Sequence, residues 1–388
     1  MLRVGIVGWG WMGQVHARAY ARLRQHYPEA PLRPRLVAVA DTATDDRLTS
    51  AIDIFGFQDA HSDWRDLIAR DDIDAVSVTG PNFIHSDVAV AAAEAGKHLW
   101  VEKPAGRNAA ETRAICDAVR ASGVQSAAGF NYRNAPAVEL ARQLIGDGRL
   151  GRINHVLIRL LADYAAHPEG ALTWRFKTEW SGSGVLGDLA SHGVDLARYV
   201  IGEITALACD DATFIAHRPQ ANMAASHFSR GTGGELGEVE NEDYIAALLR
   251  FEGGSRGILE SSRASVGEQC TYGIEVHGER GALSWDFRRM GEMQLCIDQD
   301  YQNASYVTRY VTPGDGEFGR FQPASGLAMG YDDLKVVEAY HLVQSIATGQ
   351  PHGATVADAL VAAEIIEAMV ESARSRRWVT LDEFVRTK

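Results

Sequence analysis

The chain has 388 residues, which is enough for two domains with cores of their own. Its 38 Lys and Arg against 51 Asp and Glu give a formal net charge of −13, which argues against a nucleic-acid partner or an anionic membrane surface. Four cysteines without paired spacing indicate a reducing compartment, and no apolar run reaches the length of a membrane span. We therefore expect a cytoplasmic protein.

A predicted strand over residues 2–8 leads directly into a glycine-rich turn and a helix predicted over 14–27. The turn has the G-x-G-x-x-G pattern in the strand–turn–helix context that dinucleotide binding requires. Its first glycine permits the tight turn, the second lets the backbone approach a pyrophosphate, and the third lets helix and strand pack closely. Free N–H groups at the start of the helix would face the anion. The residues predicted to bind the cofactor here are Gly8, Gly10, Trp11, Met12 and Gly13.

The second predicted strand, residues 35–41, ends in Asp41. An acid at this point hydrogen-bonds the adenosine ribose hydroxyls and repels a 2′-phosphate. Residues 42–46 supply no Arg or Lys that could hold such a phosphate. We therefore expect the cofactor to be NAD rather than NADP.

Strands and helices continue to alternate up to residue 144, which predicts a doubly wound parallel sheet. The strands are predicted over 75–79, 98–101 and 125–130, and the helices over 86–95, 109–121 and 135–144. Ligands of such sheets bind beyond the carboxyl ends of the strands. The turn residues predicted to reach the nicotinamide end of the cofactor are Pro81, Asn82, His85, Glu102, Lys103, Asn131 and Tyr132.

The second half of the chain carries a series of predicted strands separated by turn signals, which favours a large, mostly antiparallel sheet. These strands are predicted over 153–161, 204–215, 243–251, 255–262, 271–277, 282–286 and 293–298. The Gly- and Ser-rich stretch 221–237 is predicted to be a mobile excursion. An open sheet has two faces to bury, and the second favours a homodimer or homotetramer.

The expected domains are a dinucleotide-binding domain over 1–133 and a substrate-binding and oligomerisation domain over 134–388. Two further helices are predicted over 331–348 and 356–375, and we expect them to pack back on the first domain.

Residues 181–199 combine a glycine-rich turn with an amphipathic helix. Asp188 and His192 are four residues apart, so on an α-helix they would lie on one face. A carboxylate and an imidazole placed together can share a proton and orient a substrate hydroxyl, and imidazole titrates near neutral pH. The alternatives are a buried structural histidine and a first-turn acid that complements the helix dipole.

Together these motifs resemble the Gfo/Idh/MocA family of sugar and polyol oxidoreductases over nearly the whole chain. Residues 62–64, Trp174-Arg175 and 323–345 are similar to the levoglucosan dehydrogenase group of that family, and inositol dehydrogenases are related. The motifs that carry the family resemblance are Gly8-x-Gly10-x-x-Gly13, Pro81-Asn82-x-x-His85, Glu102-Lys103-Pro104, residues 129–133, and Gly184-x-x-x-Asp188-x-x-x-His192-x-x-Asp195.

The resemblance implies an α/β protein, with a Rossmann domain followed by an α+β domain that has a large open sheet. It also implies an NAD-dependent dehydrogenase that oxidises a secondary ring hydroxyl of a sugar, glycoside, aminosugar or inositol-like cyclic polyol. His192 would be the base, Lys103 would assist it, and Asp188 would bind substrate and pair with them. Ala105 stands where many members have Leu, which leaves the lysine unaffected.

Further contacts are expected from loop residues. Trp174 and Arg175 are predicted to reach the cofactor or the substrate. The histidines have no metal-ligand spacing, so no metal is expected. The residues predicted to contact substrate are Lys103, Asn131, Tyr132, Tyr164, Asp188, His192 and Tyr331.

Two other functions share the same motifs. One is a redox-neutral NAD-dependent glycosidase or epimerase that retains its cofactor. The other is a non-catalytic sugar sensor, which the presence of both Lys103 and His192 disfavours.

Overall fold

The structure is a computed structural model that describes residues 1–43, 46–221, 228–231, 234–298 and 300–387. The chain divides into two compact units. Unit 1 contains Met1–Asn131 and Gly330–Ala363, and unit 2 contains Tyr132–Met329 and Glu364–Lys388. The sequence had suggested a boundary after residue 133; in the structure, the first unit ends at Asn131 and also includes the later segment from Gly330.

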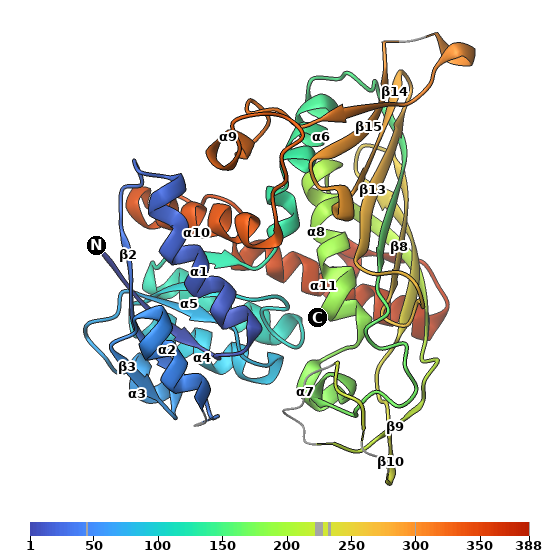
Figure 1. The fold of residues 1–388 in the computed structure, drawn as a ribbon. Helices are drawn as coiled ribbons and strands as arrows, with labels where there is room; N and C mark the ends of the chain where they lie inside the picture. The colour runs from blue at the N-terminus through green and yellow to red at the C-terminus, as the bar shows by residue number, and fades with distance from the viewer. Residues whose placement is uncertain (44–45, 222–227, 232–233, 299, 388) are drawn as a thin grey trace. The chain divides into compact units, whose positions relative to one another are not determined.

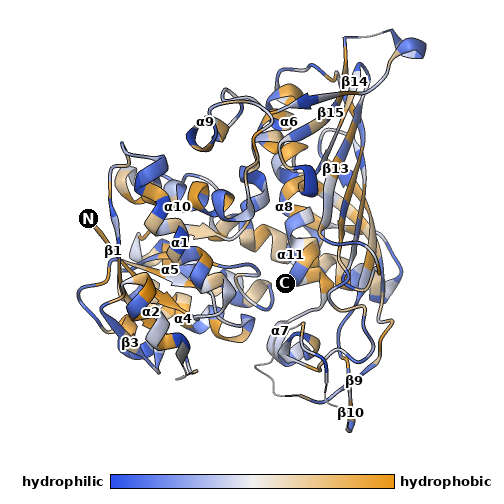
Figure 2. Ribbon diagram, in the orientation of Figure 1, coloured by the Kyte–Doolittle hydropathy of each residue, from blue (hydrophilic) through white to orange (hydrophobic). Residues whose placement is uncertain are grey.

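Unit 1 is built on a parallel sheet of six strands in the order β3-β2-β1-β4-β5-β6 (Figure 1). The order reverses next to β1, which pairs with β2 on one side and β4 on the other. This is the strand order of a dinucleotide-binding sheet, so the predicted doubly wound fold is confirmed. All four residues of β4 are buried, as expected for a strand covered on both faces, and hydrophobic residues also fill much of α4 (Figure 2).

The elements of unit 1 are β1 (Leu2–Val7), α1 (Trp11–His26), β2 (Pro34–Ala40), α2 (Asp46–Phe55), β3 (Asp59–His61), α3 (Trp64–Ile68), β4 (Ala75–Val78), α4 (Asn82–Glu94), β5 (His98–Val101), α5 (Ala109–Ser122), β6 (Ser126–Ala128) and α10 (Tyr331–Thr348). The helix α11 (Val356–Ser375) begins in unit 1 and ends in unit 2. The elements α2, β3 and α3 were not predicted, because runs of three to ten residues give little periodicity to read.

The late helix α10 lies alongside α1 within unit 1 (Figure 1). Arg18 and Arg22 of α1 form ion pairs of 2.5 Å with Asp332 and Asp333 of α10. These contacts make α10 part of the first unit, although eight of the nine strands of unit 2's sheet precede it in the sequence and only β17 follows it.

Unit 2 is built on a sheet of nine strands in the order β16-β15-β14-β13-β7-β12-β11-β8-β17. Only the β7–β12 pair is parallel among the pairs described, which confirms the predicted large, mostly antiparallel sheet. The helix α8 packs on one face of it. A Cβ added at Gly193 of α8 would lie 2.7 Å from Leu160 Cδ1 and 2.9 Å from Leu259 Cδ1, so α8 packs closely on the leucines of β7 and β12 at this glycine.

The elements of unit 2 are α6 (Pro136–Gly146), β7 (Ile153–Leu161), α7 (Thr178–Ser181), α8 (Ser191–Val200), β8 (Ile204–Ala212), β9 (His217–Pro219), β10 (Leu236–Glu238), β11 (Tyr244–Phe251), β12 (Arg256–Ser262), β13 (Thr271–Gly278), β14 (Gly281–Asp286), β15 (Glu292–Ile297), β16 (Val307–Tyr310), α9 (Phe318–Phe321), β17 (Val379–Thr380) and α12 (Leu381–Arg386). Within the predicted excursion over 221–237, residues 222–227 and 232–233 lie outside the described residues, and the excursion's end belongs to β10.

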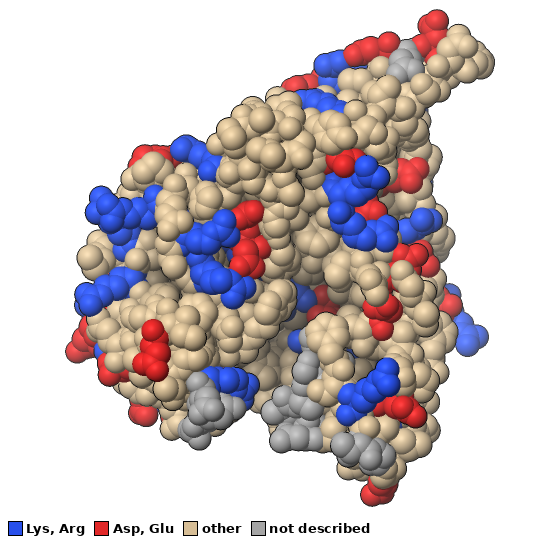
Figure 3. Space-filling view, viewed as in Figure 1, with Lys and Arg blue, Asp and Glu red and all other residues tan. Residues whose placement is uncertain are grey.

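The face of the nine-stranded sheet opposite α8 is of mixed character. Leu248 and Ile258 are 51% and 43% exposed, and the Arg159–Glu260 pair, at 3.6 Å, lies on neighbouring strands. On the side of the molecule seen in Figure 3, basic and acidic side chains are interspersed.

Every helix in the described part of the chain is too short or too polar to span a membrane.

Candidate active site

The glycine turn of unit 1 has the geometry needed to hold a dinucleotide. Gly8 has a φ of +95°, and a Cβ there would collide with the backbone of Gly80. A Cβ at Gly13 would collide with Gly8 O, whereas a Cβ at Gly10 would meet nothing within 4 Å. The first and third glycines are therefore needed by the turn itself, and the second faces open space where a pyrophosphate fits. The helix α1 begins directly afterwards, at Trp11, with Met12 in its first turn.

Asp41 lies at the end of β2, beside this turn. Its carboxylate accepts hydrogen bonds from Trp9 N at 2.6 Å and from Ala43 N at 2.8 Å, one to each oxygen. A carboxylate oxygen can accept more than one hydrogen bond, so both oxygens can still bind ribose hydroxyls. The hydrogen bonds from the two backbone N–H groups fix the orientation in which the carboxylate would meet the ribose.

His85 joins two of the turns at the carboxyl edge of the sheet. Its Nδ1 lies 2.8 Å from Pro104 O and its Nε2 lies 2.8 Å from Gly80 O. Burial lowers the pKa of this imidazole, although both carbonyls oppose the shift. We had expected His85 and the neighbouring Pro81 and Asn82 to contact the cofactor. In the structure, both His85 nitrogens face the backbone, which suits it to holding the Lys103–Pro104 turn.

Glu102 and Asn131 follow the last two strands of the sheet and differ in their surroundings. Glu102 is buried, and its carboxylate lies beside His16 and Lys335 rather than in open space. Asn131 is fully buried, and neither atom of its amide has a hydrogen-bond partner among the described residues. A buried amide without partners is costly, so Asn131 fits a contact with a bound cofactor or substrate.

Tyr331 and Trp11 lie together in unit 1. Their ring centroids are 5.3 Å apart, and Trp11 is 63% exposed. Tyr331 was predicted from the sequence to contact substrate and Trp11 to contact the cofactor. The structure places the two rings side by side at the starts of α10 and α1.

In unit 2, the segment that carries Asp188 and His192 differs from the predicted continuous α-helix. Leu186–Ala190 forms a π-helical turn, and the α-helix begins only at Ser191. The predicted α-helix is therefore wrong for Leu186–Ala190, where the hydrogen bonds run i→i+5, and the placement of Asp188 and His192 on one face stays a prediction. Glu242 Oε1 fixes its start by accepting from Gly184 N at 2.8 Å and Leu186 N at 2.9 Å. Turns of this kind are frequent at functional sites.

Asp188 contacts two residues that the sequence also singles out. Its Oδ2 accepts a hydrogen bond from the Tyr164 hydroxyl, and Arg175 Nη1 lies 3.6 Å from its Oδ1. Arg175 also lies over the Trp174 ring, 4.6 Å from its centroid. Burial and the negative charge of Asp188 raise the pKa of Tyr164, so its hydroxyl remains a donor throughout the neutral range.

His192 is 5% exposed and lies against an aromatic wall. Its ring centroid is 4.6 Å from that of Tyr132, which is in turn 5.5 Å from Tyr272. Asp195 lies three residues further along α8, and both of its oxygens accept from the Arg133 guanidinium, with Nε–Oδ2 at 3.0 Å. That buried ion pair anchors the helix that presents His192.

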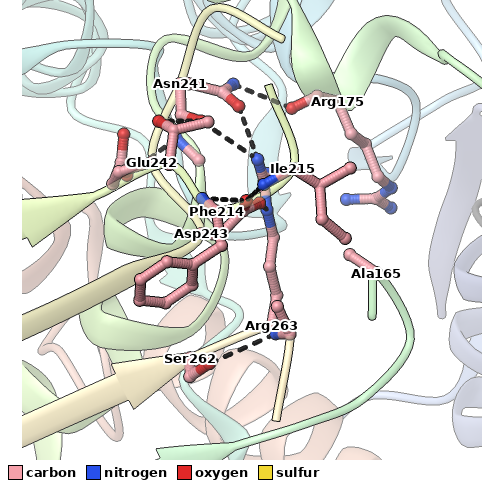
Figure 4. A network of polar contacts seen from close by, with 12 residues as sticks. Ala165, Arg175, Phe214, Ile215, Asn241, Glu242, Asp243, Ser262 and Arg263 are labelled. Carbon is pink, nitrogen blue, oxygen red and sulfur yellow. Dashed lines mark hydrogen bonds and ion pairs between the residues drawn. The ribbon is translucent and has the colours of Figure 1, made fainter. Parts of the chain in front are cut away.

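A buried network lies next to Ala165, the residue that follows Tyr164 (Figure 4). Arg263 Nε donates to Asp243 Oδ1 at 2.8 Å, and its Nη2 donates to Asn241 Oδ1 at 2.7 Å. Arg218 donates to the carbonyls of Ala165 and His167. Both guanidiniums lie over the Phe176 ring, at 4.6 and 4.3 Å from its centroid. This network fixes the loop that carries Tyr164.

Several of these residues were not identified from the sequence. Tyr272 lies in a strand whose period-2 pattern indicates that its side chain is buried. That pattern does not indicate that Tyr272 faces Tyr132. The partners Lys335, Arg133 and Glu242 are distant in sequence from the motifs that they support, so no local signal marks them. Across the described residues, His, Cys, Asp and Glu form no group of three or more that could hold a metal ion.

Known proteins resemble both halves of the chain. The family model described as "Oxidoreductase family, NAD-binding Rossmann fold" matches residues 2–130, and that of the "GFO/IDH/MocA C-terminal domain" matches 138–284. Levoglucosan dehydrogenase from Pseudarthrobacter phenanthrenivorans is 35% identical over 385 residues, which cover 98% of each chain. Myo-inositol 2-dehydrogenase from Thermotoga maritima is 24% identical over 388 residues, 99% of this chain and 100% of the relative.

Solved structures show the same similarity. Levoglucosan dehydrogenase in complex with NADH and L-sorbose superposes with a TM-score of 0.91 at 35% identity, and the match covers 98% of both chains. An NAD-binding oxidoreductase from Klebsiella pneumoniae superposes with a TM-score of 0.90 at 32% identity, covering 98% of this chain and 99% of the other.

Proposed function

The chain belongs to the Gfo/Idh/MocA family of oxidoreductases, with an NAD-binding Rossmann domain, and from that premise we propose that it oxidises a secondary ring hydroxyl of a sugar or cyclic polyol. The observation that carries the proposal is the group of side chains in unit 2. His192 lies against Tyr132, and Asp188 is held by Tyr164 and Arg175. An imidazole, a carboxylate and flat aromatic faces are what a hydroxylated ring needs for recognition and proton removal.

In this mechanism each polar side chain has a separate task. His192 accepts the proton of the reacting hydroxyl, and the Lys103 ammonium donates a hydrogen bond to the same oxygen as negative charge develops on it. Asp188 accepts a hydrogen bond from a neighbouring hydroxyl and so orients the ring. The glycine turn and Asp41 would hold NAD, which would supply the acceptor for the hydride of the carbinol carbon, so that the alcohol would become a ketone.

The substrate class follows from the polarity of the group in unit 2. Asp188 and Arg175 offer an acceptor and a donor to adjacent hydroxyls, while Tyr132 and Tyr272 offer apolar faces to ring carbons. The relatives named above are dehydrogenases of levoglucosan and myo-inositol, both of which are cyclic and rich in hydroxyls. We therefore propose a cyclic polyol or anhydrosugar first, with glycosides and aminosugars as further members of the test panel.

The test is NADH formation, followed by absorbance, with a panel of cyclic polyols, sugars and aminosugars. His192→Asn should lower kcat by about 10²- to 10⁴-fold, the usual contribution of a positioned base, and Lys103→Ala should also lose activity. Both variants should still bind NAD. The exposed His155, on the nine-stranded sheet of the same unit, provides the matched control, and His155→Asn should keep full activity.

Wild-type activity in the His192 and Lys103 variants would contradict this mechanism. Turnover of substrate with retained cofactor and no net NADH would instead indicate the redox-neutral alternative.

We also propose that the protein is a cytoplasmic homodimer or homotetramer that uses the sheet face opposite α8. The exposed Leu248 and Ile258 on neighbouring strands of that face support this assembly. A monomeric mass by light scattering would contradict it.

A further inference from the structure

A buried cluster of charged side chains lies beneath the Glu102-Lys103-Pro104 turn of unit 1. Lys335 Nζ contacts Glu102 Oε1 and lies 2.8 Å from Glu338 Oε2, and His16 Nε2 lies 3.0 Å from the same Glu102 oxygen. These four side chains are 7% exposed or less. They come from the end of β5, from α1 and from α10, so the cluster joins three separate elements of one unit.

The Glu102 carboxylate is confined on its remaining sides. Its Oε2 accepts from Lys103 N at 3.3 Å, and a Cβ added at Gly129 would lie 2.5 Å from that oxygen. The carboxylate is therefore held between the backbone of β6's end and the backbone of the residue proposed to act on substrate. Any movement of Glu102 must be transmitted to the Lys103 peptide group.

Glu102, Lys335 and His16 each keep one charge state through the neutral pH range. Burial opposes the ionisation of Glu102, but Lys335 and His16 together hold the pKa of Glu102 below its usual range. Burial likewise disfavours the Lys335 ammonium, but Glu102 and Glu338 raise the pKa of Lys335. Burial, assisted by Lys335, lowers the pKa of His16 to about 4, so its imidazole is neutral.

We propose that Lys335 is a positioning residue for the reaction: its buried ammonium holds the Glu102 carboxylate against the Lys103 peptide and keeps the charge beneath that turn constant. This inference rests on the proposed function, in which Lys103 acts on the substrate oxygen. Lys335 itself touches Glu102, Glu338 and the face of Trp100, where its Nζ lies 5.6 Å from the ring centroid. It acts through Glu102, and from the opposite side His85 holds the Pro104 carbonyl.

Without the Lys335 ammonium, the charge of Glu102 would lose its main compensation. The groups that face Glu102 are then His16 from α1, Glu338 from α10, His85 from α4 and Lys103 from the turn itself. Burial is the main cause of the lowered pKa of His16, and Lys335 adds to it, so removing Lys335 should raise the pKa of His16 from about 4 towards its ordinary value. The pH profile of kcat should therefore show an ionisation that the wild-type profile lacks in this pH range.

The experiment compares the pH profiles of kcat for the wild type, Lys335→Met, Lys335→Arg and the double variant Glu102→Gln/Lys335→Met. Lys335→Met should lower kcat by about 10- to 100-fold, because an ångström-scale displacement of a reacting group has effects of that size. It should also gain an ionisation between about pH 5 and pH 8. Lys335→Arg should restore the wild-type profile, and the double variant should lose the added ionisation, since Gln at 102 carries no charge.

Lys97 provides the control for a merely structural effect. It is a buried lysine of the same unit at the opposite end of β5, where its Nζ donates to Arg70 O at 2.7 Å and to Ile73 O at 3.0 Å. Lys97→Met should lower the Tm without changing the shape of the pH profile. If Lys335→Met does not fold, the double variant decides, because replacing both partners of a buried pair is tolerated better than removing one.

A wild-type kcat and pH profile in Lys335→Met would overturn the inference; if only the double variant folds, a wild-type kcat in that variant would overturn it, because the carboxylate that Lys335 holds is then absent as well. If Lys103→Ala is inactive in the same assays, the proposed function would still stand. An active Lys103→Ala would instead overturn the proposed function, whatever the Lys335 variants do.

Discussion

Both units bury clusters of charged side chains near residues proposed to act on substrate, but the two clusters are compensated differently. In unit 1, Glu102 and Lys335 compensate each other through side chains, and Glu102 bonds directly to the Lys103 peptide. In unit 2, Arg218 and Asp243 bind mainly backbone groups, including the N–H groups of Phe214 and Ile215 at 2.9 and 3.0 Å from Asp243 Oδ2. The first cluster is suited to setting the charge near a reacting group, and the second to holding loops in place.

This difference separates stability from activity. Losing a charge in unit 2 should release several loop contacts at once and should lower the free energy of unfolding. Losing a charge in unit 1 should change the electrostatics at a turn whose backbone is also held by His85. The predictions below test that separation, starting with the largest expected effect.

Arg263→Met should destabilise the protein by about 3–5 kcal/mol, because it leaves Asp243 as a buried charge without its ionic partner. The two side chains are 2% and 0% exposed and 2.8 Å apart, so solvent cannot replace the lost contact. Urea unfolding of both proteins measures the loss. The matched control is Arg152→Met, which breaks the Arg152–Glu279 pair, where the arginine is 71% exposed; a change below about 1 kcal/mol is expected. If Arg263→Met and Arg152→Met lost equal free energy of unfolding, the Arg263 network would not be what holds the loops of unit 2 in place.

The His16 prediction concerns pH and the cluster of unit 1. The unfolded chain protonates its histidines below about pH 6.5, whereas folded His16 stays neutral until about pH 4. Between these values the unfolded state binds more protons, so stability falls as the pH falls, by about 3 kcal/mol in total from this residue. Glu102, whose pKa is lowered, loses its contribution only at more acid pH.

The measurement is the free energy of unfolding between pH 7 and pH 4 for the wild type and His16→Asn. The variant should show a shallower decline. His85 and His98 also have lowered pKa values and contribute in the same direction, so only the difference between the two proteins reports on His16. Parallel curves would show that His16 is not held neutral by its burial.

The sequence predicted the parts of this molecule that depend on local pattern. The strands over 98–101 and 153–161 and the helices over 331–348 and 356–375 have the predicted bounds, because each is an apolar or periodic run between turn signals. The glycine turn was recognisable because a strand and a helix flank it within a few residues. The short α2, β3 and α3 offered no such pattern.

What the sequence could not predict depends on contacts between distant segments. Glu102 and Lys335 are separated by 233 positions and Arg133 and Asp195 by 62, and nothing in either local sequence indicates the other. The π-helical turn before Ser191 was also missed, because a run such as 186–190 has the composition of an ordinary α-helix, while its start is fixed by Glu242 from another segment. Tertiary packing decides these features.

The smallest expected effect concerns Tyr164, which connects the network of unit 2 to Asp188. The backbone next to it is fixed, since Ala165 N donates to Arg263 O at 2.9 Å and Ala165 O accepts from Arg218. Tyr164→Phe keeps the ring in that setting and removes only the hydroxyl that bonds Asp188. A lost hydrogen bond to a charged group has a net value of about 1.5–3 kcal/mol, but Asp188 keeps Arg175 nearby, so kcat/KM should fall by only about tenfold.

The Tm of Tyr164→Phe should change little, because the loop is held through backbone groups that this variant retains. Tyr244→Phe is the control: its hydroxyl lies 3.4 Å from Glu260 on the nine-stranded sheet, and its removal should leave kcat/KM unchanged. If Tyr164→Phe lowered the Tm as much as Arg263→Met, Tyr164 would belong to the scaffold rather than to the substrate group. If it lowered kcat/KM alone, the Tyr164 side chain would serve activity, while the backbone of the next residue, Ala165, would serve stability.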